Sequence, residues 1–517
     1  MPRGRRRNLS RLQDLSVAIA EGISGYPGEP PFHPSEIYPE FKGKPISVSA
    51  ANHCYAGVRD CLRLLGLDSG NFGGESWNPL RELVAPGDCV LIKPNFVMHR
   101  NFGSGRLEAV VTHPSVLRAV ADYVLLALGA RGELIIGDAP QMNCDMATLC
   151  RETGMDSLVA YLRGACAEQG VRFSFTDFRE EQVEYRIGMV WKRKKLDRGD
   201  SDTVRVELGR ESFMEEISPQ RLYGADYDRR VTIRAHTNHR HEYWIAREAL
   251  RADVVISAPK LKTHSKVGTT LNIKNMVGIN TNKNHLAHYR IGSTAEGGDE
   301  FSSPGWADLF ERKLCDALLG HYWALGKYPF AVWRIGRAAI GKVFRKRGHV
   351  SFVYGNWHGN DTAWRMALDL NRILLFADAQ GVVRDFPQRR YFSVVDGIIG
   401  GDGNGPLHPD ACNSGVLLAG FNPLAVDWFA TEWMGLDPSR IRMYARGAIQ
   451  MKEWVSEFSP QAITPRLKLP ERNGGKRPHS RIRFRPAPGW LGTVETYAAD
   501  EPRSNEKSDA LPDLISQ

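Results

Sequence analysis

Short apolar runs that each end in a polar or charged residue recur along this chain and constrain its fold more than any other feature. Residues 89–92 form one such run and lead into Lys93, and residues 133–136 form another and lead into Asp138. Between them, apolar residues recur at helical spacing from 114 to 128. This alternation of strand and helix predicts an α/β fold with a mostly parallel sheet and helices on both faces. Further strands are predicted at residues 46–50, 172–175, 253–257, 392–395 and 416–419.

Two insertions interrupt the alternation. The first is charged with β-like spacing, which predicts a small antiparallel excursion, and the second has helical spacing. The predicted organisation is a basic, Pro-rich arm (1–45), a first α/β core segment (46–178), the charged β-like insertion (179–232), a second core segment (233–295), the helical insertion (296–350), a third core segment (351–464) and a Pro/Arg-rich, partly disordered tail (465–517).

Composition excludes several classes of protein. The chain of 517 residues has a formal net charge of +9, but acidic residues are plentiful, so binding to nucleic acid is not expected. Its eight cysteines include no C-x-x-C pair, so no iron–sulfur cluster is expected. So few cysteines in a chain of this length indicate a reducing compartment, and the predicted location is the cytoplasm.

Basic residues are concentrated after the predicted strand 253–257. Lys260, Lys262, His264, Lys266 and Lys274 follow within twenty residues of its end. Because the carboxyl ends of parallel strands meet at one edge of a sheet, these side chains are expected near Lys93 and its neighbours. Buried cations need compensating anions. Two interpretations stay open, namely a bound substrate carboxylate or phosphate, or an internal ion-pair network with Asp138, Asp177, Asp396 and Asp402.

The first interpretation predicts a specific site. Glycine and threonine at 268–270 suit close approach of an anion, since they supply backbone N–H groups and hydroxyls. His264 lies among lysines, which lower the pKa of an imidazole and keep it neutral, as a general base requires. The predicted catalytic residues are His264, Lys262 and Asp396, and the predicted anion-binding residues are Lys93, Asn95, Lys260, Lys274, Asn275, Thr269 and Thr270.

A second dense signal is the glycine-rich stretch 396–406, interpreted as a loop after a buried strand. Carboxylates are preferred ligands of hard divalent cations, so Asp138, Asp396 and Asp402 are candidate metal ligands. The cofactor is otherwise left open. Three histidines at 236, 239 and 241 could also hold a metal, but surface histidines are the favoured interpretation.

A basic amphipathic segment spans residues 330–347. Its predicted apolar face carries Phe330, Trp333, Ile340, Val343 and Phe344, with arginines and lysines on the other sides. Such a helix can lie on an anionic membrane surface. The favoured alternative is a helix that packs on the main domain and exposes its charged side.

Several landmarks occur in an order that resembles the family of the domain of unknown function 362, over roughly residues 46–440. They are Lys93-Pro94-Asn95, Gly137-Asp138, Pro259 to His264, Thr270 to Asn275, Asp396-Gly397 with Gly403 to Pro406, and Ala425 to Asp427. The resemblance implies a site at these residues without naming a reaction. Many relatives carry a ferredoxin module whose cysteines this chain lacks, and Asp402 stands where glutamate is expected.

Together these features predict an enzyme that acts on an anionic carboxylate or phosphate small molecule in a Lys/His/Asp cleft, with a divalent metal as a candidate cofactor. The alternative is a non-catalytic binding or scaffold protein at an anionic membrane surface, where the segment 330–347 makes peripheral contact. In the first prediction the cleft carries the function, and in the second the basic arm and the segment 330–347 carry it.

Overall fold

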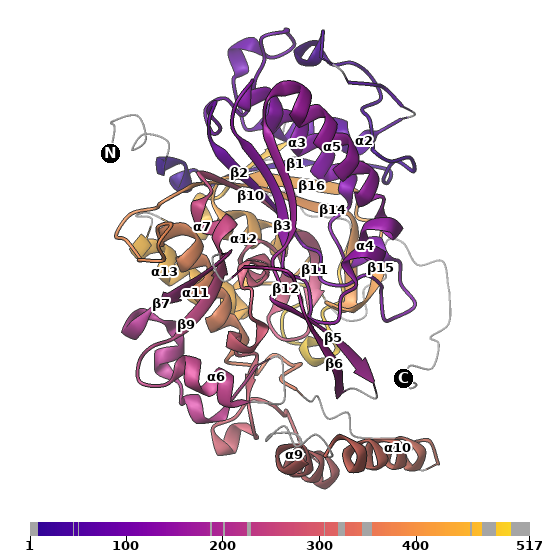
Figure 1. The fold of residues 1–517 in the computed structure, drawn as a ribbon, viewed down its shortest axis with the longest axis vertical. Helices are drawn as coiled ribbons and strands as arrows, with labels where there is room; N and C mark the ends of the chain where they lie inside the picture. Colours follow the sequence, from indigo (N-terminus) through magenta and orange to yellow (C-terminus); the bar gives the residue numbers. More distant parts are fainter. Residues whose placement is uncertain are drawn as a thin grey trace.

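A single large sheet organises the chain. The computed structural model describes residues 9–44, 46–49, 51–186, 189–199, 202–224, 229–303, 305–318, 326–343, 354–454, 458–467 and 482–497. The strand order is β17-β1-β16-β14-β10-β2-β3-β4 (Figure 1). These strands are β17 (Thr464–Leu467), β1 (Ser16–Ala20), β16 (Val416–Gly420), β14 (Arg390–Asn404), β10 (Val254–Ala258), β2 (Cys89–Pro94), β3 (Glu133–Asp138) and β4 (Arg172–Asp177).

The sheet is mostly parallel, as predicted. Strands β14, β10, β2, β3 and β4 run parallel to one another. At the other side of the sheet, β16 is antiparallel to both β14 and β1, and β17 is parallel to β1. Asn422, which follows β16, therefore lies away from the carboxyl ends of the parallel strands, where it caps α12 (Pro423–Trp433).

Helices cover both faces of the sheet, because alternate strand residues point to opposite sides. Val90 and Ile92 belong to one buried apolar cluster, and Leu91 belongs to the other. The first cluster includes helices α2 (His53–Leu64), α3 (Pro114–Leu128), α4 (Met146–Thr153) and α5 (Met155–Gln169). The second includes α7 (Arg247–Arg251), α11 (Ala363–Phe376), α12 and α13 (Arg442–Trp454). The predicted two-sided architecture is confirmed.

The structure contradicts two predictions near the start of the chain. Residues 16–20, assigned to an irregular arm, form β1 inside the sheet, because their apolar side chains are buried against neighbours on both sides. The strand predicted at 46–50 is absent over the described residues 46–49, where Val48 is exposed.

In the predicted tail, β17 and residues 482–497 are packed, with Phe484 and Trp490 buried. Residues 1–8, 468–481 and 498–517 lie outside the described part of the chain.

The glycine-rich stretch is a strand, which corrects the predicted loop. Strand β14 continues to Asn404 and pairs with β15 (His408–Cys412). The lysine motif is likewise a strand, β11 (Lys260–His264), which pairs with β14 and with β12 (Gly268–Thr270). A Cβ atom at Gly401 would lie 2.6 Å from Lys262 Cβ, so glycine here permits the two strands to approach.

The charged insertion forms small antiparallel sheets, as predicted. β5 (Glu181–Arg186) pairs with β6 (Met189–Lys195), and β7 (Thr203–Glu207) pairs with β9 (Glu242–Ala246). β8 (Leu222–Tyr223) pairs with β13 (Tyr289–Arg290), and α6 (Arg229–His236) follows β8 in the chain. Thus the second half of each of the last two ladders comes from the adjoining core segment.

The helical insertion contains α9 (Trp306–Leu318) and α10 (Lys327–Val343), which lie together at the bottom of Figure 1. Two residues of the predicted apolar face of α10 pack against α9, since Phe330 is buried and Trp333 contacts Phe310 at 4.8 Å between ring centroids. Residues 344–347 of the predicted amphipathic segment lie outside the described residues. Over the described residues, no helix has both the length and the apolar character needed to cross a bilayer.

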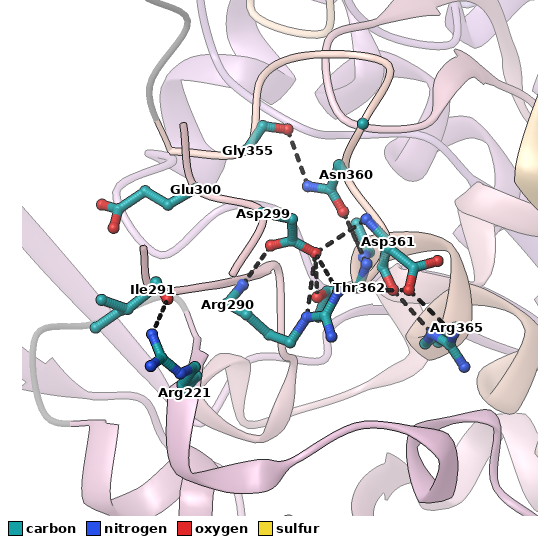
Figure 2. A network of polar contacts seen from close by, with 12 residues as sticks. Arg221, Arg290, Ile291, Asp299, Glu300, Gly355, Asn360, Asp361, Thr362 and Arg365 are labelled. Carbon is teal, nitrogen blue, oxygen red and sulfur yellow. Dashed lines mark hydrogen bonds and ion pairs between the residues drawn. The ribbon is translucent and has the colours of Figure 1, made fainter. Parts of the chain in front are cut away.

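A dense polar network joins the segment before α9 to α11 (Figure 2). Asp299 Oδ2 accepts hydrogen bonds from Thr362 Oγ1 at 2.6 Å and from Asp361 N at 2.9 Å. Arg290 lies 3.4 Å from the carboxylates of both Asp299 and Asp361. The positive and negative charges of the network balance one another, which indicates that the network is structural support.

Candidate functional site

A cavity of about 440 Å³ opens beyond the carboxyl ends of β2 and β3. Residues of β11, β12 and α8 (Asn272–Asn275) form part of its wall. In open α/β sheets this edge is the usual ligand site, because loops from several strands converge there. Among the described residues, the charged or ionisable side chains that line it, tyrosines aside, are Lys262, Lys266, Lys274, Lys283, His264, His288, His408 and Asp138.

The structure divides the predicted site residues into two sets. Those that line the cavity are Asn95, Asp138, Lys262, His264, Thr270, Lys274 and Asn275. Those that lie outside its lining are Lys93, Lys260, Thr269, Asp396 and Asp402. The predicted residues therefore gather at one edge of the sheet, but only part of them faces the same space.

Lys93 is one of the cations behind the cavity wall. Its Nζ lies 2.8 Å from Asp138 Oδ1 and donates hydrogen bonds to Asn275 Oδ1 at 3.0 Å and Pro94 O at 2.7 Å. Burial lowers the pKa of Lys93, and Asp138 opposes that effect. A Cβ atom at Gly278 would overlap the Asp138 carboxylate, so the backbone of Gly278 lies directly against the Lys93–Asp138 pair.

Lys260 forms a second buried pair. Its Nζ lies 3.0 Å from Asp396 Oδ2 and donates to Tyr26 Oη at 2.6 Å. Tyr26 in turn donates to Asp396 Oδ1 at 2.5 Å, and the backbone N–H of His113 donates to Oδ2 at 2.9 Å. Burial is the main cause of the raised pKa of Tyr26, with Asp396 second. For Lys93 and Lys260, internal ion pairing is the arrangement found.

The three aspartates considered as metal ligands are not assembled into one site. Asp138 faces Lys93, Asp396 faces Lys260, and Asp402 Oδ2 lies 2.8 Å from Arg485 Nε. Across the described residues, no group of three or more His, Cys, Asp or Glu side chains is placed to hold a metal ion. This includes the histidines at 236, 239 and 241, where His241 and His239 contact Glu215 instead.

The cavity lysines differ from Lys93 and Lys260 in their partners. Lys262 Nζ donates to Val110 O at 2.5 Å, Lys283 Nζ donates to Ala139 O at 2.7 Å, and Lys266 Nζ donates to Tyr354 O. Lys274 Nζ has no hydrogen bond or ion pair with any described residue. None of the four forms an ion pair with a carboxylate in the described part of the chain.

Uncompensated burial shifts the protonation of these lysines. Burial, reinforced by Lys93, lowers the pKa of Lys274 to about 8. Burial is also the main reason that the pKa of Lys283 falls to about 7 and that of Lys266 to about 7. The pKa of Lys262 lies well below its usual range because of burial and then Lys260. A bound anion would reverse these shifts by restoring charge balance.

Two polar atoms on the cavity wall also lack partners. Asn95 Oδ1 and Thr270 Oγ1 are buried and form no hydrogen bond among the described residues. An unsatisfied buried polar atom costs about 1–3 kcal/mol, so such atoms are rare in native proteins. A ligand with polar groups would satisfy both.

Two histidines on the lining have complementary roles. His264 Nδ1 accepts a hydrogen bond from Lys266 N at 3.0 Å, so neutral His264 carries its proton on Nε2 and donates. His288 Nδ1 lies 2.8 Å from Leu286 O, which only accepts, so neutral His288 keeps Nε2 as an acceptor. Burial lowers the pKa of both, that of His288 to about 3. In the neutral form, Nε2 is therefore an acceptor on His288 and a donor on His264.

Lys283 was missed by the sequence reasoning, and Lys266 and His288 were not selected. Lys283 lies in a run of polar residues, 280–285, that has no apolar periodicity to mark it as buried. The one available signal was the density of asparagine, lysine and histidine in that run.

A further positioning residue is Asp427, whose carboxylate accepts hydrogen bonds from Asn272 N and Ile273 N at 2.8 Å and so holds α8 in place. Burial raises the pKa of Asp427 to about 7.

Comparison with known proteins finds a match to the family model of the domain of unknown function DUF362 at residues 90–199 and 193–432. A thylakoid-associated protein of Synechocystis sp. is 23% identical over 430 residues, which span 81% of this chain and 84% of that protein. A crystal structure of a Thermotoga maritima protein is 10% identical with a TM-score of 0.30, over 78% of this chain. The chain spans 60% of the length of that protein, and the low score carries no argument about function.

Proposed function

The chain belongs to the DUF362 family, and we propose that it is an enzyme that acts on a small carboxylate or phosphate in the lysine-lined cavity. The observation that carries the proposal is the charge of the cavity wall. Four lysines line it, and the acidic side chain among its described lining residues, Asp138, is already paired with Lys93. Buried cations without counter-charges are strongly unfavourable, so a bound anion is the arrangement that stabilises them.

The proposed roles follow from the contacts of each residue. Lys262, Lys266 and Lys283 bind the anion, and Asn95 and Thr270 use their unpaired polar atoms to orient it. His264 donates a hydrogen bond from Nε2–H, and His288 accepts a proton at Nε2. Asp396 lies outside the lining, so its proposed role is to hold Lys260 and β11 in place.

Isothermal titration of the full chain with oxalate and with inorganic phosphate tests the proposal. Lys283→Met removes one cavity cation, and Lys194→Met removes an exposed lysine on β6 as the matched control. We expect at least one of the two anions to bind the wild-type protein and the Lys194→Met variant equally. Affinity in Lys283→Met should fall by about tenfold, as expected for loss of one charge-assisted contact. If neither anion bound the wild-type protein, the anion site would be refuted.

A second candidate function is a binding role at an anionic membrane surface in the cytoplasm. The observation that favours it is an exposed apolar stripe on α10, where Tyr328, Val332 and Ile335 are 52%, 71% and 56% exposed. Residues 317–360 also contain seven lysines and arginines and no acidic residue. Basic segments with exposed apolar side chains bind anionic bilayers. The Synechocystis relative carries the name of a thylakoid-associated protein, which is compatible with this location.

Flotation with vesicles tests the membrane role separately. We expect the full chain to float with vesicles of phosphatidylglycerol and not with phosphatidylcholine alone. The double variant Val332→Asp and Ile335→Asp should remain in solution, whereas Val382→Asp, which changes an exposed valine outside the two insertions, should float. Equal flotation of both variants would exclude α10 as the contact.

A further inference from the structure

We propose that Lys274 is a nucleophile that forms an imine with the carbonyl carbon of the anionic substrate. The inference rests on the proposed function and deepens it, because it defines the substrate class as an anion that also bears an aldehyde or ketone. It assigns Lys274 a role different from that of the other three cavity lysines.

The first ground is the geometry of the four lysines. Lys262, Lys266 and Lys283 each donate to a backbone carbonyl, which fixes the position of the Nζ atom. Lys274 lines the same cavity, yet its Nζ contacts no hydrogen-bond or ion-pair partner in the described chain. A nucleophilic amine needs a free lone pair and freedom to reach carbon, and Lys274 is the one of the four so arranged.

The second ground is the position of Lys274 among other cations. It lies close enough to Lys262, Lys266, Lys283, His264 and His288 to lower the pKa of each. Burial and a neighbouring cation are the two means by which proteins convert a lysine into a reactive amine at neutral pH. Both act here, since Lys274 is almost fully buried and the positive charge of Lys93 further lowers its pKa.

The third ground is what remains for a ligand to satisfy. If the carboxylate or phosphate sits against the three fixed lysines, the adjacent carbonyl group of the same molecule can reach Lys274. Thr270 Oγ1, unpaired on the same wall, can donate a hydrogen bond to the carbonyl oxygen. An anion without a carbonyl would leave the amine of Lys274 unused.

The chemistry balances without any further reagent. The amine lone pair attacks the carbonyl carbon, a C–N bond forms, and the carbonyl oxygen takes up a proton to give a carbinolamine. His288 Nε2 is the available acceptor for the proton that the nitrogen loses in each step, and it passes that proton to the oxygen, so that the hydroxyl leaves as water. The Nε2–H of His264 donates a hydrogen bond to that oxygen. The products are the imine and one water molecule, with no change in oxidation state.

Reductive trapping tests the inference on the full-length protein. The wild-type chain is incubated with pyruvate, or with dihydroxyacetone phosphate, in sodium cyanoborohydride, and the adduct is located by intact mass and peptide mapping. We expect one adduct on Lys274, formed at least tenfold faster than on any other lysine, and competed by oxalate or phosphate. The probe that reacts shows whether the substrate anion is a carboxylate or a phosphate.

Variants separate this inference from the proposed function. Lys274→Arg keeps the positive charge but removes the nucleophile, so it should bind oxalate or phosphate without forming an adduct, whereas Lys194→Met should behave as wild type. Anion binding by the wild-type chain with no adduct would overturn the imine and leave the proposed function standing. An adduct on Lys266 or Lys283 would also overturn it. Because oxalate competition is measured on the wild-type chain, a variant that fails to fold does not remove the test.

Discussion

Two sets of lysines lie at the same edge of the sheet and differ in whether a carboxylate is paired with them. Lys93 and Lys260 each lie within 3.0 Å of a buried carboxylate, and the polar network around Asp299 in Figure 2 is balanced in the same way. Of the four cavity lysines, Lys262, Lys274 and Lys283 are also buried and Lys266 is partly exposed. They face carbonyl oxygens or, for Lys274, no described partner. The contrast shows that lysines of one motif can either support the fold or line a ligand site. The presence or absence of a neighbouring carboxylate distinguishes the two roles.

The largest effect is expected from breaking a framework pair. Asp396→Asn leaves Lys260 buried beside Tyr26 and without a counter-charge. Removing one member of a buried ion pair costs about 3–5 kcal/mol, so the free energy of unfolding should fall by about that amount. Urea unfolding followed by circular dichroism measures it. An unchanged midpoint would show that Lys260 is not held by this pair.

A slightly smaller loss is expected when the wall behind Lys93 is crowded. A methyl group at Gly278 would overlap Asp138 Oδ1 and lie 2.5 Å from Lys93 Nζ. Gly278→Ala should therefore lower the free energy of unfolding by about 1–3 kcal/mol, the usual cost of overpacking. Gly164→Ala is the matched control, since a methyl group there meets nothing within 4 Å and favours the helix. If both variants were stable, the pair would have room to move.

The cavity set should respond in the opposite direction. Lys274→Met removes a buried, unbalanced charge, so the anion-free protein should become more stable by up to about 3 kcal/mol, since each unit of pKa shift corresponds to about 1.4 kcal/mol. The folded pKa of Lys274, about 8, lies below its unfolded value, so the advantage of the variant is full below pH 8. It should shrink as pH rises from 8 toward 10.5, where wild-type Lys274 is neutral when folded. Thermal unfolding of both proteins between pH 6 and 10 measures the difference, and a destabilised variant would contradict the uncompensated charge.

The smallest expected effect is on the pH dependence of anion affinity. The pKa values of Lys266 and Lys283, about 7, mean that the empty cavity loses positive charge as pH rises from 6 to 9. Anion binding should therefore weaken by about tenfold over that range and take up protons, as linkage requires. Titration calorimetry in two buffers of different ionisation enthalpy detects the uptake. Release of protons on binding would contradict the lowered pKa values of Lys266 and Lys283.

Much of the fold was predictable because burial leaves a local pattern. The runs at 89–92, 133–136 and 172–175 are continuous apolar or alternating segments, and each became a parallel strand. The errors arose where pairing rather than pattern decides. Residues 16–20 form a strand because β16 and β17 flank them, and the glycine-rich stretch 396–404 belongs to a strand because β15 and β11 pair with it.

The sequence by itself determined that lysines, histidines and asparagines gather at the carboxyl edge of a parallel sheet, because strand direction is encoded in local alternation. Only the tertiary structure decided which lysines are balanced. Lys260 and Asp396 are 136 positions apart, and Lys283 carries no apolar pattern that reveals its burial. The physical reason is that the free energy of a buried charge depends on the atoms within a few ångströms of it in space, which no local stretch of sequence specifies.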